Sequence, residues 1–230
     1  MSAVPIGLVI FDCDGVLVDS EPLSIRILMR LLSECGVELS AEEASEAFLG
    51  KSLASVCESL RRDHGVDVDD LALERMRQRL YQTIRQELQP ISGIADTLER
   101  LGRQACVASS SQPERIRLSL EVAGLSRFFG GNVFSATMVA RGKPAPDLFL
   151  HAARQMHVAP GQCMVIEDSP AGVTAALEAG MGVCGFVGGS HARTAAHRQK
   201  LAALKPKAVF EDMRQLPGLL RDMEKDRKVS

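Results

Sequence analysis

The chain has 230 residues, a formal net charge of −2, 46% hydrophobic and 24% charged residues. This length and composition suit one large or two modest globular domains. The nearly balanced charge gives no electrostatic reason to expect nucleic acid or an anionic membrane surface as a partner. No apolar run approaches the ~18 residues that span a bilayer, and no export signal precedes the first apolar run. We therefore expect a cytoplasmic protein without nucleic-acid or membrane partners. The sequence does not fix the oligomeric state, for which we expect a monomer or weak dimer.

A short apolar stretch near the N-terminus ends at two acids. Residues 6–11 form a run of the kind that is buried on both faces of a parallel sheet. Asp12 and Asp14 follow directly, before Gly15. Because ligands of open α/β sheets bind beyond the carboxyl ends of the strands, we expect a functional site here. The alternative is a polar strand-to-loop transition in which Gly15 makes the turn.

The next part of the chain has helical periodicity and no convincing strand. Pro22 suits the first position of a helix that stops at Gly36, and Ser40 to Glu43 form a capping-box pattern for a second helix. Two more helices are predicted, over residues 54–62 and 70–87. The apolar positions of the last one are expected to be Leu71, Met76, Leu80 and Ile84. These segments predict a small helical bundle inserted after the first strand.

From Pro90 onward, predicted strands alternate with predicted helices. The expected strands are 104–109, 132–136, 162–166, 182–187 and 207–210. The expected helices run from 113 to about 124, from 146 to about 157, and from 170 to 180. This alternation predicts a parallel sheet covered on both faces, a Rossmann-like doubly wound α/β core. The charged end, residues 221–230, is expected to fray.

These patterns predict two domains. Residues 1–17 and 89–230 are expected to form the catalytic core, and residues 18–88 an all-helical cap. Both connections lie near the carboxyl end of the first strand. We therefore expect the cap to lie over the site, with residues 19–22 and 88–93 as hinges.

Four polar clusters fall at predicted strand ends or in the loops just beyond them. They are Asp12 with Asp14, Ser109 to Ser111, Lys143, and Glu167 with Asp168. Taken singly, the serines could be a solvated helix start, the lysine a surface charge and the last pair a helix N-cap. Together, the acids would repel one another without a cation, and Mg²⁺ is the usual partner of carboxylates and substrate phosphate. Lys143 adds positive charge, and Ser109 with the Ser110 and Ser111 amides forms an anion cradle.

The four clusters resemble the motifs of the haloacid dehalogenase superfamily in residue type and order. The matching stretches are Asp12 to Val16, Val107 to Ser111, Gly142 to Asp147, and Val165 to Ser169. The helical insertion resembles one cap type of this superfamily. The resemblance implies a Mg²⁺-dependent phosphatase that acts on a small phosphorylated metabolite through a phosphoaspartate.

The resemblance also implies the role of each residue. Asp12 attacks phosphorus, and Asp14 protonates the leaving alcohol and then deprotonates the attacking water. Asp12, the backbone carbonyl of Asp14 and Asp168 ligate Mg²⁺, and Glu167 acts through a water. Ser109, Ser110 and Lys143 bind the phosphate.

Two departures separate the chain from β-phosphoglucomutase, a capped relative within the superfamily. Ser24 stands where the mutase has a histidine, ten residues after Asp14, and Leu53 stands where it has an arginine. In overall pattern the chain is similar to the 6-phosphogluconate phosphatase group, which suggests sugar or sugar-acid phosphates as substrates. A phosphosugar mutase is the first alternative. A non-catalytic sugar-phosphate sensor is the second, and the presence of both Asp12 and Asp14 argues against it.

The cap is expected to choose the substrate because it faces the leaving group. Glu21, Gly50 and Lys51 are the candidates, although Lys51 could equally be a solvated charge. Gly188 to His191 follow a predicted strand and could reach the rim of the site. A lone histidine in a glycine-rich loop is more often exposed.

Overall fold

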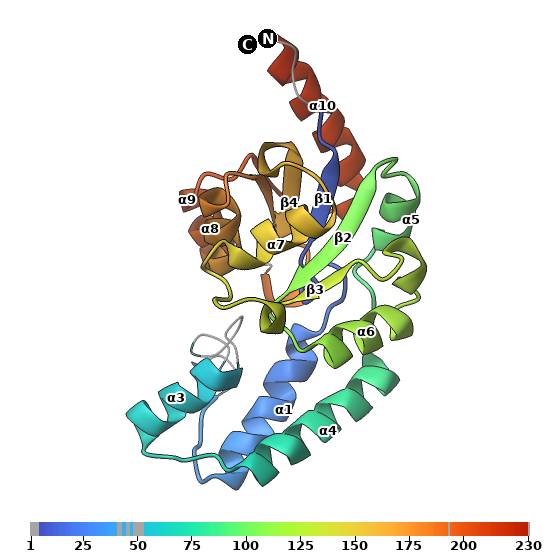
Figure 1. Cartoon of the computed structure of the whole chain (residues 1–230). Coiled ribbons are helices and arrows are strands. Elements are labelled where there is room, and N and C mark those ends of the chain that lie inside the picture. The colour runs from blue at the N-terminus through green and yellow to red at the C-terminus, as the bar shows by residue number, and fades with distance from the viewer. Residues whose placement is uncertain (1–4, 41–42, 45–46, 48–52, 193, 230) are drawn as a thin grey trace. The chain divides into compact units, whose positions relative to one another are not determined.

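The structure is a computed structural model that describes residues 5–40, 43–44, 47, 53–192 and 194–229. The chain divides into two compact units (Figure 1). The core unit comprises Met1–Asp19 and Gln89–Ser230, and the helical unit comprises Ser20–Leu88. No helix among the described residues has the length and apolar character needed to cross a membrane.

The core unit is built on a six-stranded sheet in the order β3-β2-β1-β4-β5-β6, with every pair of neighbours parallel. The strands are β1 (Leu8–Phe11), β2 (Gln104–Ser109), β3 (Val133–Ser135), β4 (Cys163–Glu167), β5 (Gly182–Phe186) and β6 (Ala208–Phe210). Phe11 lies opposite Val107 on β2 and Ile166 on β4. This register brings the carboxyl ends of the three central strands to one edge of the sheet.

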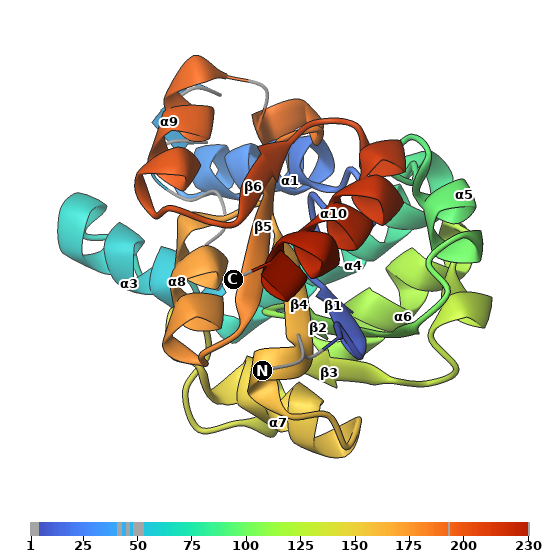
Figure 2. The same ribbon diagram turned by 90° about the horizontal axis from the view of Figure 1, so that it is seen from above.

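Helices cover both faces of the sheet, as the alternating pattern predicted. They are α5 (Ile94–Glu99), α6 (Pro113–Val122), α7 (Asp147–Gln155), α8 (Pro170–Glu178), α9 (Ala195–Ala203) and α10 (Leu216–Val229). Helices α8 and α10 lie on opposite sides of the sheet (Figure 2). The Rossmann-like, doubly wound α/β core is therefore confirmed.

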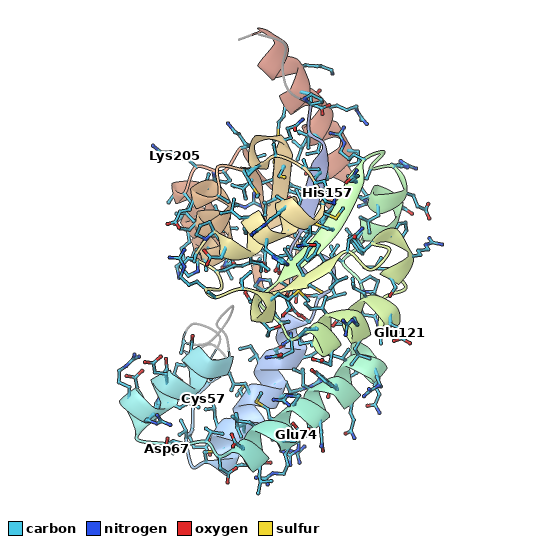
Figure 3. The ribbon with its side chains drawn as sticks, viewed as in Figure 1. Cys57, Asp67, Glu74, Glu121, His157 and Lys205 are labelled. Atoms are coloured by element: carbon cyan, nitrogen blue, oxygen red, sulfur yellow. The ribbon has the colours of Figure 1, made fainter. Side chains whose placement is uncertain are left out.

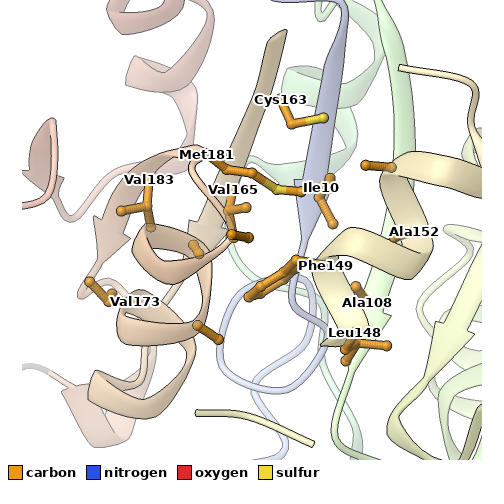
Figure 4. Close-up of a cluster of buried hydrophobic side chains, with 14 of the residues drawn as sticks. Ile10, Ala108, Leu148, Phe149, Ala152, Cys163, Val165, Val173, Met181 and Val183 are labelled. Atoms are coloured by element: carbon orange, nitrogen blue, oxygen red, sulfur yellow. The ribbon is translucent and has the colours of Figure 1, made fainter. Parts of the chain in front are cut away.

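The central strands are buried on both faces, which explains their continuous apolar sequences. On one face, Ile10 and Val165 share a buried cluster with Phe149 of α7 and Val173 of α8 (Figure 4). Fully burying an apolar side chain of this size contributes roughly 1.5–3 kcal/mol. This packing holds the strand ends, and the residues that follow them, in fixed positions.

The helical unit contains α1 (Glu21–Glu34), α3 (Leu53–His64) and α4 (Asp70–Glu87) around a small apolar core. The capping box is confirmed at its two ends: the Ser40 amide donates to Glu43 Oε2 at 2.8 Å, and the Glu43 amide donates to Ser40 Oγ at 3.2 Å. The helix expected after it lies partly outside the described residues.

One expected apolar position of α4 is wrong. Leu71 is 70% exposed, whereas Ala72, Leu80 and Ile84 are buried. The buried stripe of α4 recurs every four residues, and Leu71 is one residue, or about 100° of helix rotation, away from it.

The expectation that residues 221–230 fray is also wrong. Residues 221–229 continue α10, which runs to Val229, and Ser230 lies outside the described residues. Glu224 Oε1 accepts a hydrogen bond from the Ile6 amide at 3.0 Å and pairs with Arg103 at 2.8 Å. These long-range contacts tie the C-terminal helix to the start of the first strand.

The two connections to the helical unit run beside each other in the core unit. Val18 and Pro90 form an antiparallel bridge. The Asp19 amide donates to the Gln89 carbonyl at 3.0 Å, and the Ile91 amide donates to the Leu17 carbonyl at 2.9 Å. The chain therefore leaves and re-enters the core at one place.

Candidate active site

The site centres on Lys143, whose side chain is 4% exposed. Its Nζ lies 2.6 Å from Asp12 Oδ1, 2.6 Å from Glu167 Oε1 and 3.0 Å from the Ala108 carbonyl oxygen. The partners follow β1, end β4 and lie on β2, so the sheet order assembles them. An ammonium group has three hydrogens, and each has an oxygen here.

The electrostatics of these buried groups are strongly perturbed. Burial raises the pKa of Asp12 well above its usual value; Lys143 opposes this, while Glu167 and Asp168 add to it. Burial likewise raises the pKa of Asp168, with Glu167 as the next cause. Burial alone would lower the pKa of Lys143, but the Asp12 and Glu167 carboxylates together raise it above its usual value. Lys143 thus pairs with two of the three buried carboxyl groups, and the third, Asp168, pairs with His191.

Asp14 is held on both carboxylate oxygens. Arg115 Nη2 donates to Oδ1 at 2.7 Å, and Ser111 Oγ donates to Oδ2 at 2.6 Å. The side chains of Arg115 and Asp14 are 18% and 12% exposed. Arg115 was not predicted from the sequence. The available signal was its place in the first turn of the helix that follows the serine cluster.

The serine cluster divides into different roles. Ser109 ends β2, is 1% exposed, and its Oγ accepts the Ser111 amide at 3.1 Å. Ser110 is exposed. The binding of phosphate by Ser109 and Ser110 stays a prediction. In this structure the Ser111 hydroxyl donates a hydrogen bond to Asp14.

Asp168 is held by two histidines: His191, from the loop that the sequence placed at the possible rim of the site, and His197, which the sequence did not single out. Asp168 Oδ2 lies 2.8 Å from His191 Nε2, and the Asp168 backbone oxygen lies 2.6 Å from His197 Nε2. The His191 side chain is 9% exposed and contacts Asp168, so the interpretation that its loop reaches the site holds and the alternative of an exposed histidine is wrong. Gly15, with φ +80°, has no room for a side chain, because the Asp168 carboxylate and His191 ring occupy the space.

The donor set fits a hard divalent cation. No three His, Cys, Asp or Glu side chains within the described ranges form a group able to hold a metal alone. Mg²⁺, however, usually binds one or two protein carboxylates and completes its shell with water and substrate phosphate. Asp12 and Asp168, with the backbone carbonyl of Asp14, are candidates for such a set. Both oxygens of Glu167 already accept hydrogen bonds, from Lys143 and from the amide and hydroxyl of Ser169.

The predicted substrate residues belong to the helical unit. Glu21 begins α1. Gly50 and Lys51 lie outside the described residues. Their roles stay predictions.

Comparisons with known proteins extend over both units. A family model described as haloacid dehalogenase-like hydrolase matches residues 9–186, more than half of the chain. The chain is 31% identical over 216 residues to 6-phosphogluconate phosphatase of Escherichia coli (strain K12), covering 93% of this chain and 94% of that protein. It is 30% identical over 190 residues to beta-phosphoglucomutase of Bacillus subtilis (strain 168), covering 75% of this chain and 80% of that protein.

A solved structure agrees in fold as well as in sequence. The conserved haloacid dehalogenase-like protein from Agrobacterium tumefaciens str. C58 has a TM-score of 0.83 at 34% identity, covering 95% of this chain and 99% of that chain. The matched family region begins in β1 and ends with β5, so it contains Asp12, Lys143 and Asp168. This chain is an enzyme of the haloacid dehalogenase-like hydrolase family.

Proposed function

We propose that this enzyme is a Mg²⁺-dependent phosphatase that hydrolyses small sugar and sugar-acid phosphates through a phosphoaspartate on Asp12. The observation that carries the proposal is the bridge from Lys143 to Asp12 and Glu167, both at 2.6 Å, beside Asp168 at the edge of the sheet. This bridge places the Asp12 carboxylate, which can attack phosphorus, next to the buried Lys143 ammonium, which can bind a phosphate oxygen.

In the first step, an Asp12 carboxylate oxygen forms a bond to phosphorus while the bond from phosphorus to the sugar oxygen breaks. Asp14 donates a proton to that leaving oxygen. Lys143 orients the Asp12 carboxylate and balances charge on the phosphoryl oxygens. The products are a phosphoaspartate and the free alcohol.

In the second step, Asp14 takes a proton from a water molecule, and the water oxygen attacks phosphorus. The bond between phosphorus and Asp12 breaks, which releases phosphate and restores the carboxylate. Arg115 and Ser111 hold Asp14 in place for both transfers. We assign Asp12, Asp168 and the Asp14 carbonyl as Mg²⁺ ligands, with Glu167 acting through a water. When bound, Mg²⁺ supplies positive charge that lowers repulsion between carboxylate and phosphate.

The substrate class rests on similarity, and the choice of hydrolysis over mutase action rests on Ser24. By its name, the E. coli relative that matches nearly the whole chain acts on 6-phosphogluconate. A mutase needs a group that shields the phosphoenzyme from water, and Ser24 offers no imidazole; its Oγ donates to the Ser20 carbonyl at 3.1 Å. We therefore favour hydrolysis over phosphoryl return to the sugar.

The test is phosphate release from a panel of phosphorylated sugars, sugar acids and hexitols with Mg²⁺, for wild type and Asp12→Asn. We expect Asp12→Asn to lose at least about 10³-fold in kcat, because the nucleophile is removed. Circular dichroism checks that the variant is folded. Absence of release from every substrate by wild type would refute the phosphatase and favour the sensor. Isomerised sugar phosphate as the main product would favour the mutase.

We also propose that the helical unit acts as the cap and supplies Glu21, Gly50 and Lys51 to the leaving-group side. A lysine there would favour a sugar-acid phosphate over a neutral one. Lys51→Ala is then expected to raise KM for 6-phosphogluconate by up to about fivefold, which corresponds to about 1 kcal/mol for one solvent-screened charge contact, with little change for a neutral hexitol phosphate. Equal KM changes for both substrates would exclude this role.

A further inference from the structure

We infer that His191 is a positioning residue for the metal ligand Asp168: its imidazole holds Oδ2, so that Oδ1 is presented to Mg²⁺. This inference rests on the proposed function in taking Asp168 as a ligand. The notable feature is that a histidine from a glycine-rich loop after β5 reaches an acid that directly follows β4.

The contact itself is direct and buried. His191 Nε2 lies 2.8 Å from Asp168 Oδ2, and the two side chains are 9% and 8% exposed. A carboxylate bound to a metal ion is ionised and only accepts hydrogen bonds, so with Mg²⁺ in place Nε2 would carry the hydrogen and donate it. A charge-assisted bond shielded from water fixes the direction of its acceptor more firmly than an exposed one.

The loop before His191 is shaped to bring the ring to this place. A side chain at Gly189 would lie 3.0 Å from the Gly15 carbonyl oxygen and 3.0 Å from the His191 ring. Ser190 is tied to Asp19, since its amide and Oγ lie 3.2 and 2.8 Å from Asp19 Oδ1. On the other side of His191, Ala192 is fully buried. Both neighbours of His191 are therefore anchored.

A second histidine from the same stretch of chain holds the main chain of Asp168. His197 Nε2 lies 2.6 Å from the Asp168 backbone oxygen, which only accepts, so this nitrogen also donates. The rings of His191 and His197 meet edge to face with centroids 5.6 Å apart. The side chain and main chain of one acid are thus fixed by two packed imidazoles.

This arrangement is that of a partner in the outer shell of a metal site. Hydrogen-bond partners of metal ligands orient them, and removing such a partner typically weakens metal binding 10–100-fold. A purely structural histidine would instead affect folding and leave the Mg²⁺ affinity of the folded protein unchanged. Mg²⁺ affinity therefore separates the two roles.

The experiment compares two replacements of similar length in the full chain. His191→Gln keeps an N–H donor, whereas His191→Met keeps the volume and removes the donor. We expect His191→Met to raise the Mg²⁺ dissociation constant about 10–100-fold, and His191→Gln to stay within about threefold of wild type. His64→Ala, at the exposed end of α3, is the control and should leave the constant unchanged. The readouts are calorimetric Mg²⁺ titration and competition by Mg²⁺ for bound Mn²⁺.

Unfolding in EDTA completes the test. Equal Mg²⁺ constants for His191→Met and wild type, or equal losses in His191→Met and His191→Gln, would overturn the positioning role. A lowered unfolding midpoint in EDTA with an unchanged constant would assign His191 a structural role and also overturn it. A Mg²⁺ shift in His191→Met alongside no phosphate release by wild type would refute the proposed function and leave the inference standing. Phosphate release by wild type with no change of the Mg²⁺ dissociation constant in His191→Met would support the proposed function and overturn the inference.

Discussion

The two units of the molecule contain ion pairs of the same length in very different surroundings. In the core unit, Lys143 pairs with Asp12 at 2.6 Å, and their side chains are 4% and 10% exposed. In the helical unit, Arg79 pairs with Glu34 at the same 2.6 Å, and their side chains are 32% and 39% exposed. A contact distance alone therefore says little about what a pair contributes.

Exposure separates the pairs by function as well as by energy. The ion pairs described in the helical unit, including Arg61 with Asp67 and Arg77 with Glu74, have side chains between 32% and 75% exposed. Figure 3 labels Asp67 and Glu74 of these pairs. Such pairs contribute about 0–1 kcal/mol and are screened by salt. Breaking a buried pair leaves an uncompensated charge at a cost of about 3–5 kcal/mol. The core unit also has exposed pairs, such as Arg127 with Glu99, but the pairs of Lys143 are buried where substrate and metal are expected to bind.

The largest expected effect comes from removing the buried ammonium. Lys143→Met should lower the free energy of unfolding by about 3–5 kcal/mol, because Asp12 and Glu167 lose their shared buried cation. Urea unfolding in EDTA measures this. A loss below about 1 kcal/mol would mean that the two units do not differ as proposed.

The next effect is stabilisation by the metal. If Asp12 and Asp168 hold Mg²⁺, then Mg²⁺ at about 100 times its dissociation constant should raise the free energy of unfolding by about 2.7 kcal/mol. Asp168→Asn should lose most of this gain. A gain retained in full by Asp168→Asn would place the cation elsewhere.

The two units should also respond to pH in opposite directions. The raised pKa values of Asp12 and Asp168 mean that the folded state binds more protons than the unfolded chain above about pH 4. In EDTA, the free energy of unfolding should therefore fall as pH rises from about 4 toward neutrality, by up to about 1.4 kcal/mol per pH unit for each group.

In the helical unit the sign is reversed. The hydrogen bond from Arg79 lowers the pKa of Glu34 in the folded state. Any contribution of this pair to the free energy of unfolding is therefore present above the pKa of Glu34 in the unfolded chain, and it is lost as pH falls through the lower pKa of the folded state. Urea titrations between pH 4 and 7 should show the fall in wild type and a shallower one in Asp12→Asn. Unchanged slopes in the two proteins would mean that Asp12 is not the titrating group.

The smallest expected effect is at the exposed pair. Arg79→Met should change the free energy of unfolding by less than about 1 kcal/mol, and 1 M salt should reduce even that difference. Urea unfolding at two salt concentrations measures it. If Arg79→Met lowered the free energy of unfolding as much as Lys143→Met does, the proposed difference between buried and exposed pairs would be contradicted.

Local sequence was sufficient for the strands and for the polar groups that end them. Apolar runs such as 104–109 are bounded by polar residues, and parallel topology then brings Asp12, Lys143 and Glu167 together. The family resemblance implied their roles, which stay predictions. Helix phase was less secure, because a shift of one residue moved Leu71 to the outside of α4.

What the sequence did not reveal depends on tertiary contacts between loops. His191 reaches Asp168 only because β4 and β5 are neighbours in the sheet, and a loop carries no periodic signal of burial. Arg115 likewise meets Asp14 across many intervening residues. The charged C-terminal stretch indicated fraying by composition, but Glu224 finds its partners near the other end of the chain.

The antiparallel pairing of the two connections makes the helical unit a replaceable module. Val18 and Pro90 bridge, and the Asp19 amide meets the Gln89 carbonyl at 3.0 Å, so the core could be closed between them by a two-residue hairpin turn. No strand of the sheet would change its neighbours. A related core could therefore carry a different insertion at this place while keeping the same strand order.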